Sequence, residues 1–379
     1  MSRASVASPP LAPVSAPQRA RAAGPMFRAI GTSLPETSEP QAQVVRRMAE
    51  LWKLKGTALT RWERIAAGAG IETRYGVRPM EEVIHLSTAK RMTIYEEHAP
   101  ELAAAAAMQA LQQADITPND VTDLIVVSCT GFSAPGVDIA LVQRLGLPAS
   151  VRRTMIGFMG CFGAISGLRT AVGACSANPE AIALVVCVEL CSLHLRADDD
   201  VQNQVASALF GDGAAAALVV GPQAAPPSNA GRNVGSAQSS AIGELAVGNS
   251  LLLPHGREWM TWRVTDAGFA MTLAREVPEA LRESLGEFVG RVCPTRPRSF
   301  IVHPGGPGIL DAVQHALRLN DHDLRASRTV LRRCGNMSSA TVLFVLEEAM
   351  RCGLELPAML LSFGPGLTIE STQILSGTD

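Results

Sequence analysis

The chain alternates between unbroken apolar runs and longer stretches in which apolar residues recur at helical spacing. The apolar runs at residues 121–131, 181–190 and 211–221 predict buried strands. A strand buried on both faces lacks the alternation of a half-exposed strand, which is typical of sheets covered by helices. Helices are expected over the ranges 41–54, 60–67, 100–114, 137–145 and 268–289, and from about Cys161 onward. This pattern predicts an α/β fold.

The two halves of the chain follow one order of elements. An apolar strand leads into a helix at 121–145 and again at 297–319. The small-residue helix near Cys161 is matched by a helix over 335–352, and the strand at 181–190 by a strand–turn–strand over 358–375. A repeat of element order predicts duplicated halves, 26–225 and 226–379, with a surface linker at 222–240. Such halves, packed face to face, would bring Cys161 against His303 and Asn336.

The ends and the composition set bounds on the class of protein. Residues 1–25 are rich in Ser, Ala and Pro without an acidic residue or an apolar core, so we expect a disordered tail and not a secretory signal. Of the 379 residues, 47% are hydrophobic and 18% charged, which is enough apolar sequence for two domain cores. The net charge of −2 implies no general attraction to nucleic acid, and no apolar run is long enough to span a membrane.

The eight cysteines form no C-x-x-C pair, and their spacing fits no zinc site. Several lie in apolar strands. We therefore expect reduced thiols in a cytoplasmic protein that needs no metal and no cofactor.

Three short segments carry candidate chemistry: Cys161 in GFMGCFGAISG, His303 in IVHPGGPGIL and Asn336 in RRCGNMSSA. Cys161 falls at a predicted helix start, where free N–H groups favour a thiolate, and a nearby His303 imidazolium would add an ion pair. The Gly-Pro turn after His303 would hold the imidazole rigidly at a cleft. Asn336 offers an amide donor that cannot titrate, although a simple helix N-cap fits its spacing equally well. The set predicts a sulfur ionised at rest that forms a thioester, with donors for negative charge beside it.

These segments, together with ALFGDGAAAALVVG and SFGPGLTIES, resemble the motifs of the chalcone/stilbene synthase family, the type III polyketide synthases. The resemblance runs from about Met26 to Leu375. It implies the thiolase fold, a duplicated five-layered αβαβα arrangement, and a homodimer that uses acyl-CoA and malonyl-CoA. By resemblance, Cys161 takes the acyl starter, and His303 and Asn336 stabilise the enolate that malonyl decarboxylation leaves. Repeated extension would end in cyclisation.

The resemblance also implies a set of residues around the cavity. Phe210 matches a gatekeeper Phe, and Met271 occupies the second gatekeeper position, where the family pattern has Phe. Trp262 falls where plant enzymes keep a glycine, Cys191 and His194 fall where they usually have Thr, and Ser338 is retained. These departures argue against a plant-like chalcone pocket. A flexible Met at the gate suits a fatty acyl starter, and hence an alkylpyrone or alkylresorcinol-type product.

For coenzyme A, the resemblance places Arg61 and Arg64 at the tunnel mouth, with Gly68 at a third position that is basic in the family. The backbone near Gly308 would meet the pantetheine arm. Both arginines could equally be solvated helix charges. The loop GFSAPGVD resembles a family loop at the dimer interface, which implies a cis peptide before Pro135.

Two alternatives remain open from the sequence. A ketoacyl synthase III-like enzyme of fatty-acid synthesis would share the Cys-His-Asn set but perform a single condensation from acyl carrier protein. A non-catalytic thiolase-fold scaffold would act only through its contacts. Turnover with malonyl-CoA alone distinguishes a polyketide synthase from the ketoacyl synthase III-like enzyme. The reactivity of Cys161 distinguishes an enzyme from a non-catalytic scaffold.

Overall fold

The computed structural model describes residues 23–196, 200–224 and 241–376. The predicted tail at 1–25 lies almost wholly outside the described residues, as does most of the predicted linker at 222–240. In the described residues, regular structure begins with a strand at Met26.

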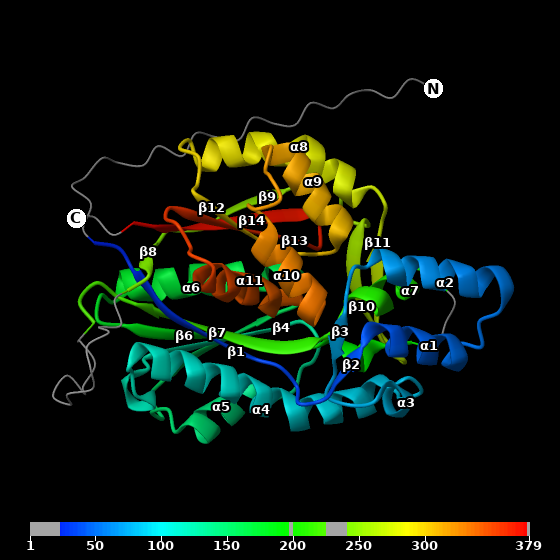
Figure 1. The fold of residues 1–379 in the computed structure, drawn as a ribbon. Coiled ribbons are helices and arrows are strands. Elements are labelled where there is room, and N and C mark those ends of the chain that lie inside the picture. Colours follow the sequence, from blue (N-terminus) through cyan, green and yellow to red (C-terminus); the bar gives the residue numbers. More distant parts are fainter. Residues whose placement is uncertain (1–22, 197–199, 225–240, 377–379) are drawn as a thin grey trace.

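The framework is one hydrogen-bonded network of ten strands that forms two stacked mixed sheets, with one short strand joining them (Figure 1). The first sheet contains β1 (Met26–Ser33), β7 (Asp212–Val220), β6 (Ile182–Leu190), β4 (Asp123–Ser128) and β5 (Arg152–Gly157). The second contains β12 (Ser299–Val302), β13 (Ala358–Gly364), β14 (Thr368–Leu375) and β9 (Asn249–Leu252). Strand β8 (Gly243–Leu245) pairs with both β1 and β14, so hydrogen bonding continues from one sheet into the other.

Helices fill three layers around these sheets (Figure 1). Helices α6 (Gly163–Ala177) and α11 (Thr341–Arg351) lie between the sheets. Helices α8 (Val277–Val292) and α9 (Pro307–Leu317) cover one outer face, and α4 (Thr88–Ala114) and α5 (Val137–Leu145) cover the other. The result is the five-layered αβαβα arrangement of the thiolase fold.

The remaining elements gather mostly at one end, where the site lies. They are β2 (Ser38–Pro40), α1 (Gln41–Leu51), α2 (Gly56–Gly68), β3 (Thr73–Tyr75), α3 (Met80–Val83), α7 (Val201–Leu209), the hairpin β10 (Met260–Thr265) and β11 (Gly268–Leu273), and α10 (Arg325–Cys334).

The duplication predicted from element order is present. Strand β4 runs parallel to β6, which is antiparallel to β7; in the second half β12 runs parallel to β13, which is antiparallel to β14. Each central helix follows a short 3₁₀ turn, Gly160–Phe162 before α6 and Ser338–Ala340 before α11. The middle layer explains the small residues of α6, because a Cβ at Gly167 would lie 2.8 Å from Val185 Cγ1.

Two predicted helices were wrong in their limits. Helix α4 begins at Thr88, not near Pro100, because Ser87 caps it by accepting a hydrogen bond from the Lys90 N–H, and the buried Pro100 is tolerated within it. The expected helix over 268–289 is in fact strand β11 followed by α8, which starts at Val277 with Pro278 in its first turn. Strand β11 takes its conformation from pairing with β10, a contact that helical spacing cannot reveal.

Within the described ranges, no helix combines the length and the apolar character that crossing a bilayer requires. The same part of the chain contains no group of three or more His, Cys, Asp or Glu side chains placed to hold a metal ion.

Candidate active site

Cys161 lies in the 3₁₀ turn that opens into α6, between the two sheets, and is only 6% exposed. The preceding Gly160 has φ +72°, and a Cβ there would lie 2.5 Å from Pro365 Cδ. Glycine is therefore required, both for the left-handed backbone and for the close approach of the loop after β13. The turn presents the sulfur to a cavity at the carboxyl ends of the strands.

Asn336 lies in the segment between α10 and the 3₁₀ turn before α11. Its backbone is fixed by two hydrogen bonds, from its own N–H to the Leu209 carbonyl (2.9 Å) and from the Gly211 N–H to its carbonyl (3.0 Å). Its side-chain Oδ1 accepts from the Ser338 N–H (2.9 Å) and from the Thr341 hydroxyl (3.3 Å). With Oδ1 committed, the Nδ2 group is the one that faces Cys161, whose sulfur it and Ser338 can hydrogen-bond. Asn336 is not the helix N-cap that its spacing also allowed, because Met337 holds that position before the 3₁₀ turn. Its Oδ1 instead closes a local turn with the Ser338 N–H.

His303 follows directly on β12 and extends its pairing with β13, donating its backbone N–H to the Leu361 carbonyl at 2.8 Å. The side chain is 1% exposed, yet neither ring nitrogen has a hydrogen-bond partner among the described residues. Buried polar atoms are rarely left in this state, because the lost hydration is not compensated. Both ring nitrogens are therefore able to form hydrogen bonds with a bound ligand.

The carboxyl end of β13 connects the two halves of the site. A Cβ at Gly364 would lie 2.6 Å from the ring of Phe162, the neighbour of Cys161. The same strand carries Leu361, which pairs with His303. The structure thus places the Asn336 side chain near the Cys161 sulfur, and places the strand before His303 beside the strand that touches the Cys161 turn.

Burial opposes the predicted thiolate at rest. Burial raises the pKa of the Cys161 thiol to about 12; the Ser338 hydrogen bond opposes this shift, the nearby Glu189 carboxylate adds to it, and the Asn336 hydrogen bond again opposes it. Burial lowers the pKa of His303 to about 3. Desolvation thus favours the neutral form of each group and opposes the predicted thiolate–imidazolium pair, which stays a prediction. The sequence motifs did not reveal how deeply the Cys161 thiol and the His303 imidazole are buried between the sheets.

Alkylation of Cys161 by iodoacetamide should accelerate about tenfold per pH unit from about pH 7 to 9.5, because thiolate is the reactive form and the raised pKa keeps its fraction small. Peptide mass spectrometry in a Cys352→Ser background measures this rate without interference from the exposed Cys352. A rate that levels off near neutral pH would instead show a thiolate–imidazolium pair at rest.

A narrow cavity of about 30 Å³ lies beside Cys161. Its lining includes five of the predicted pocket residues, Cys191, Phe210, Trp262, Met271 and Ser338. A second space of about 20 Å³ adjoins it and shares Cys191, Phe210, Trp262 and Met271, and the predicted His194 lines this second space. Both spaces are small and hold only a water or two, since one water needs roughly 10–15 Å³ on this measure. A long acyl chain must therefore displace side chains that line them, such as Met271.

The hairpin β10–β11 forms one wall of this cavity and is fixed by aromatic side chains. The Trp262 Nε1–H donates to the Cys129 carbonyl at 2.8 Å. His194 stacks on the Phe269 ring at 4.0 Å, accepts the Phe269 N–H at Nδ1 and donates from Nε2 to the Thr130 carbonyl. Burial lowers the pKa of His194 to about 3, so it stays neutral and acts as a fixed strut.

Sequence reasoning missed several lining residues: Cys129, Thr130, Met260, Thr261 and Pro365. Cys129 and Thr130 follow the carboxyl end of β4, a position where parallel strands present functional groups, so their placement could have been anticipated. Met260 and Thr261 reach the site only through the unpredicted hairpin. Glu189 was also missed. It is fully buried and accepts hydrogen bonds from the Cys129 N–H (2.9 Å), the Thr130 hydroxyl (2.7 Å) and the Ser339 hydroxyl, which ties the loops of the site together.

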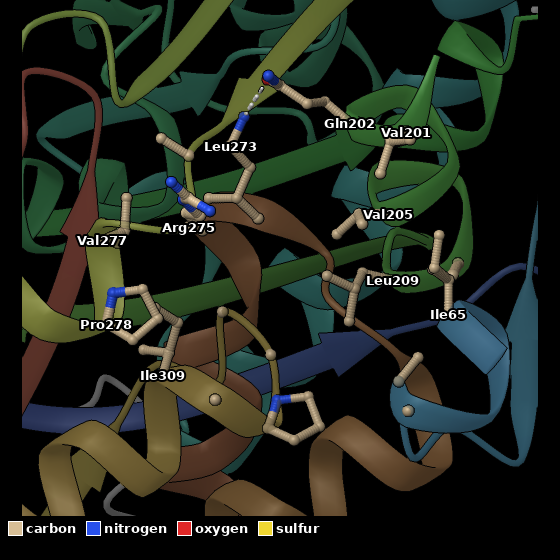
Figure 2. A pocket seen from close by; sticks show the side chains of 18 of the residues that line it. Ile65, Val201, Gln202, Val205, Leu209, Leu273, Arg275, Val277, Pro278 and Ile309 are labelled. Atoms are coloured by element: carbon tan, nitrogen blue, oxygen red, sulfur yellow. Dashed lines mark hydrogen bonds between the residues drawn. The ribbon is translucent and has the colours of Figure 1, made fainter. Parts of the chain in front are cut away.

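A much larger cavity of about 690 Å³ lies between α2, α7 and the starts of α8 and α9 (Figure 2). It includes Arg64, Gly68 and Gly308, as the resemblance implies for the tunnel mouth. Arg61 is not among the described residues that line it, and its Nε donates to Gln204 Oε1 at 3.3 Å. The lining also contains Arg275, which sequence reasoning did not identify. The peptide bond between Ala134 and Pro135 is cis, as expected, and so is the one between Leu356 and Pro357.

Comparison with known proteins agrees with this geometry. Models of the chalcone and stilbene synthases match residues 14–224 with the N-terminal domain and residues 244–377 with the C-terminal domain. The chain is 33% identical over 361 residues to the 1,3,6,8-tetrahydroxynaphthalene synthase of Streptomyces peucetius subsp. caesius, covering 92% of each chain. It is 30% identical over 362 residues to the alpha-pyrone synthesis polyketide synthase-like Pks18 of Mycobacterium tuberculosis, covering 91% of this chain and 89% of that protein. The crystal structure of the 1,3,6,8-tetrahydroxynaphthalene synthase of Streptomyces coelicolor A3(2) superposes with a TM-score of 0.82 at 28% identity, covering 93% of this chain and all (100%) of that one.

The chain belongs to the chalcone and stilbene synthase family. It is a type III polyketide synthase, an acyltransferase that performs decarboxylating condensations. This membership favours the polyketide branch over the ketoacyl synthase III-like alternative and over a non-catalytic scaffold.

Proposed function

We propose that Cys161 carries the growing acyl chain, and that His303 and Asn336 bind the thioester carbonyl of malonyl-CoA. Two observations carry this proposal: both ring nitrogens of the buried His303 imidazole are unpartnered among the described residues, and the oxygen of the Asn336 amide is already committed. A thioester oxygen entering between them would accept hydrogen bonds from both.

Loading begins with a proton transfer. Because burial favours the neutral form of both the Cys161 thiol and the His303 imidazole, the imidazole can accept the thiol proton as the sulfur attacks the acyl-CoA carbonyl. The C–S bond to Cys161 forms, and the bond to the CoA sulfur breaks. The proton on His303 then leaves with the CoA thiolate, which restores the neutral imidazole.

Extension needs the same donors in a second role. When malonyl-CoA loses CO₂, the electron pair of the broken C–C bond moves into the thioester and places negative charge on its oxygen. The Asn336 amide stabilises this enolate without titrating, in a site from which water is largely excluded. The enolate carbon attacks the acyl-Cys161 carbonyl, lengthens the chain by two carbons and releases the Cys161 thiolate. The extended chain, now a CoA thioester, returns to the sulfur or cyclises.

For the starter, we propose a fatty acyl group, with an alkylpyrone or alkylresorcinol-type product. The support is the apolar, narrow space that continues past Cys161 between Met271, Trp262 and Phe210, which suits an extended chain better than fused rings. Pks18, a relative that covers the same length, is named for alpha-pyrone synthesis, whereas the Streptomyces relatives are named for tetrahydroxynaphthalene. Mass analysis of products from malonyl-CoA and acyl-CoAs of graded length tests the proposal. A malonyl-only product, or a preference for coumaroyl-CoA, would contradict it.

Trp262→Gly should shift the preferred starter toward longer chains, because the indole fills the space beside the cavity where the acyl chain must pass. The matched control is Trp262→Phe, which loses the hydrogen bond to the Cys129 carbonyl but keeps most of the bulk. The preferred chain length, measured with acyl-CoAs of graded length, should increase in the glycine variant and stay near wild type in the phenylalanine variant. The same profile in both would show that the indole hydrogen bond, and not its volume, sets the selection.

A homodimer and a cytoplasmic location stay predictions. The loop after β4 and the end of β5 expose Phe132 (51%) and Phe158 (44%), whose rings lie 6.2 Å apart. Large exposed aromatic pairs favour contact with another chain, and a second copy of this protein is the partner we propose. Sedimentation velocity of the purified protein measures its mass, and a monomer at micromolar concentration would contradict the dimer.

A further inference from the structure

The large cavity is lined mainly by apolar side chains and glycines, and few of its lining side chains carry charge. Arg64 comes from α2, and Arg275 and Glu276 come from the loop between β11 and α8. Figure 2 shows Arg275 on the side of the cavity away from Ile65, the neighbour of Arg64. A ligand held here would meet an apolar passage with a cation on each of two walls.

The backbone that carries Arg275 is held on both sides. The Leu273 N–H donates to Gln202 Oε1 at 3.0 Å, the contact drawn in Figure 2, and the Ala274 N–H donates to the Trp259 carbonyl at 2.7 Å. After Arg275, the Val277 N–H returns to the Ala274 carbonyl at 3.3 Å. These hydrogen bonds fix the backbone that carries the Arg275 guanidinium at the rim of the cavity.

The guanidinium itself is available for a ligand. Its side chain is 95% exposed, and its ion pair with the Glu276 carboxylate is 3.6 Å long. Such an exposed pair is weak, so a phosphate can replace the carboxylate with little loss. Arginine binds phosphate through two parallel N–H donors, which a lysine cannot do. The starts of α8 and α9 also line this cavity, and helix N-termini favour anions.

We infer that Arg275 binds a phosphate of coenzyme A from the wall opposite Arg64, and that this contact makes the protein select CoA thioesters over phosphate-free pantetheine thioesters. The inference rests on the proposed function, in which CoA thioesters enter through this cavity. It adds the residue that recognises the nucleotide end of the substrate.

The chain offers a closely matched control for Arg275. Arg257 also pairs with the glutamate that follows it, at 3.8 Å from Glu258, and its side chain is 93% exposed. It does not line the cavity among the described residues. The two arginines therefore differ in position relative to the cavity but hardly in exposure or in their contact with the following glutamate, although Glu258 also pairs with Arg263 at 2.6 Å.

The experiment measures dissociation constants of CoA and of pantetheine by calorimetry for the wild type, Arg275→Glu, Arg275→Ala and Arg257→Glu. Arg275→Glu should weaken CoA binding about tenfold and Arg275→Ala about threefold, with pantetheine binding within twofold of wild type in both. Arg257→Glu should leave the dissociation constants of both CoA and pantetheine within twofold of wild type. The inference is overturned by unchanged CoA binding in Arg275→Glu, by an equal loss in Arg257→Glu, or by an equal loss for pantetheine.

Turnover in the same preparations separates this inference from the proposed function. A wild type that binds CoA through Arg275 but forms no product contradicts the function and leaves the inference intact. Product formation with unaltered CoA binding in Arg275→Glu contradicts the inference alone. A wild type that binds no CoA contradicts both.

Discussion

Replacing Asn336 with aspartate should lower the rate of malonyl-CoA decarboxylation about 10³-fold. One carboxylate oxygen would keep the hydrogen bonds from the Ser338 N–H and the Thr341 hydroxyl that now hold Oδ1. The other oxygen would take the place of Nδ2 and put negative charge where the enolate oxygen develops. The variant thus changes a donor into a repelling acceptor without a change in size. Chromatographic measurement of acetyl-CoA formed from malonyl-CoA follows this step by itself.

The alanine variant separates loss of the donor from added repulsion. Asn336→Ala should lower the rate of malonyl-CoA decarboxylation about 10²-fold, less than the aspartate variant does. The alanine removes one donor but adds no negative charge and leaves room for water. The circular dichroism spectrum and melting temperature of each variant show whether the Leu209–Asn336–Gly211 backbone contacts survive. Equal rates for alanine and aspartate in folded protein would mean that the amide does not face the developing charge.

Cys161→Ala should abolish polyketide formation, by at least about 10³-fold, while malonyl-CoA decarboxylation continues within about tenfold of wild type. Without the sulfur no acyl-enzyme forms, so the enolate has nothing to attack. The donors on His303 and Asn336 remain, since neither depends on the thiol for its position. Product mass analysis and the acetyl-CoA assay, run on the same sample, measure the two steps.

Cys352→Ala is the control for this variant, because Cys352 is an exposed thiol remote from the cavity lining. It should leave both steps unchanged. If decarboxylation were also lost in Cys161→Ala, the thiol would have to take part in holding the malonyl group, contrary to the division of roles proposed here.

Much of the fold could be read from local sequence. The runs at 121–131, 181–190 and 211–221 became β4, β6 and β7 because strands buried on both faces must be apolar throughout. The Gly-Pro turns after His303 and in SFGPGLTIE ended β12 and β13 where predicted. Local reasoning failed at Pro100 and at residues 268–273, where burial of α4 and pairing of β11 with β10 overrode the local preference.

The sequence by itself determined the chemical types present: one thiol, one imidazole and one amide, each at the end of a strand or the start of a helix in duplicated halves. Only the tertiary structure decided how deeply each group is buried and what surrounds it. Packing between two sheets removes water from Cys161 and His303, and desolvation penalises charge, so burial favours neutral groups where the motifs suggested an ion pair. Likewise Arg275 lines a cavity with Arg64 because the β10–β11 hairpin and α8 place it there. The physical reason is that electrostatic interaction and solvation depend on distances in space, which sequence positions do not give.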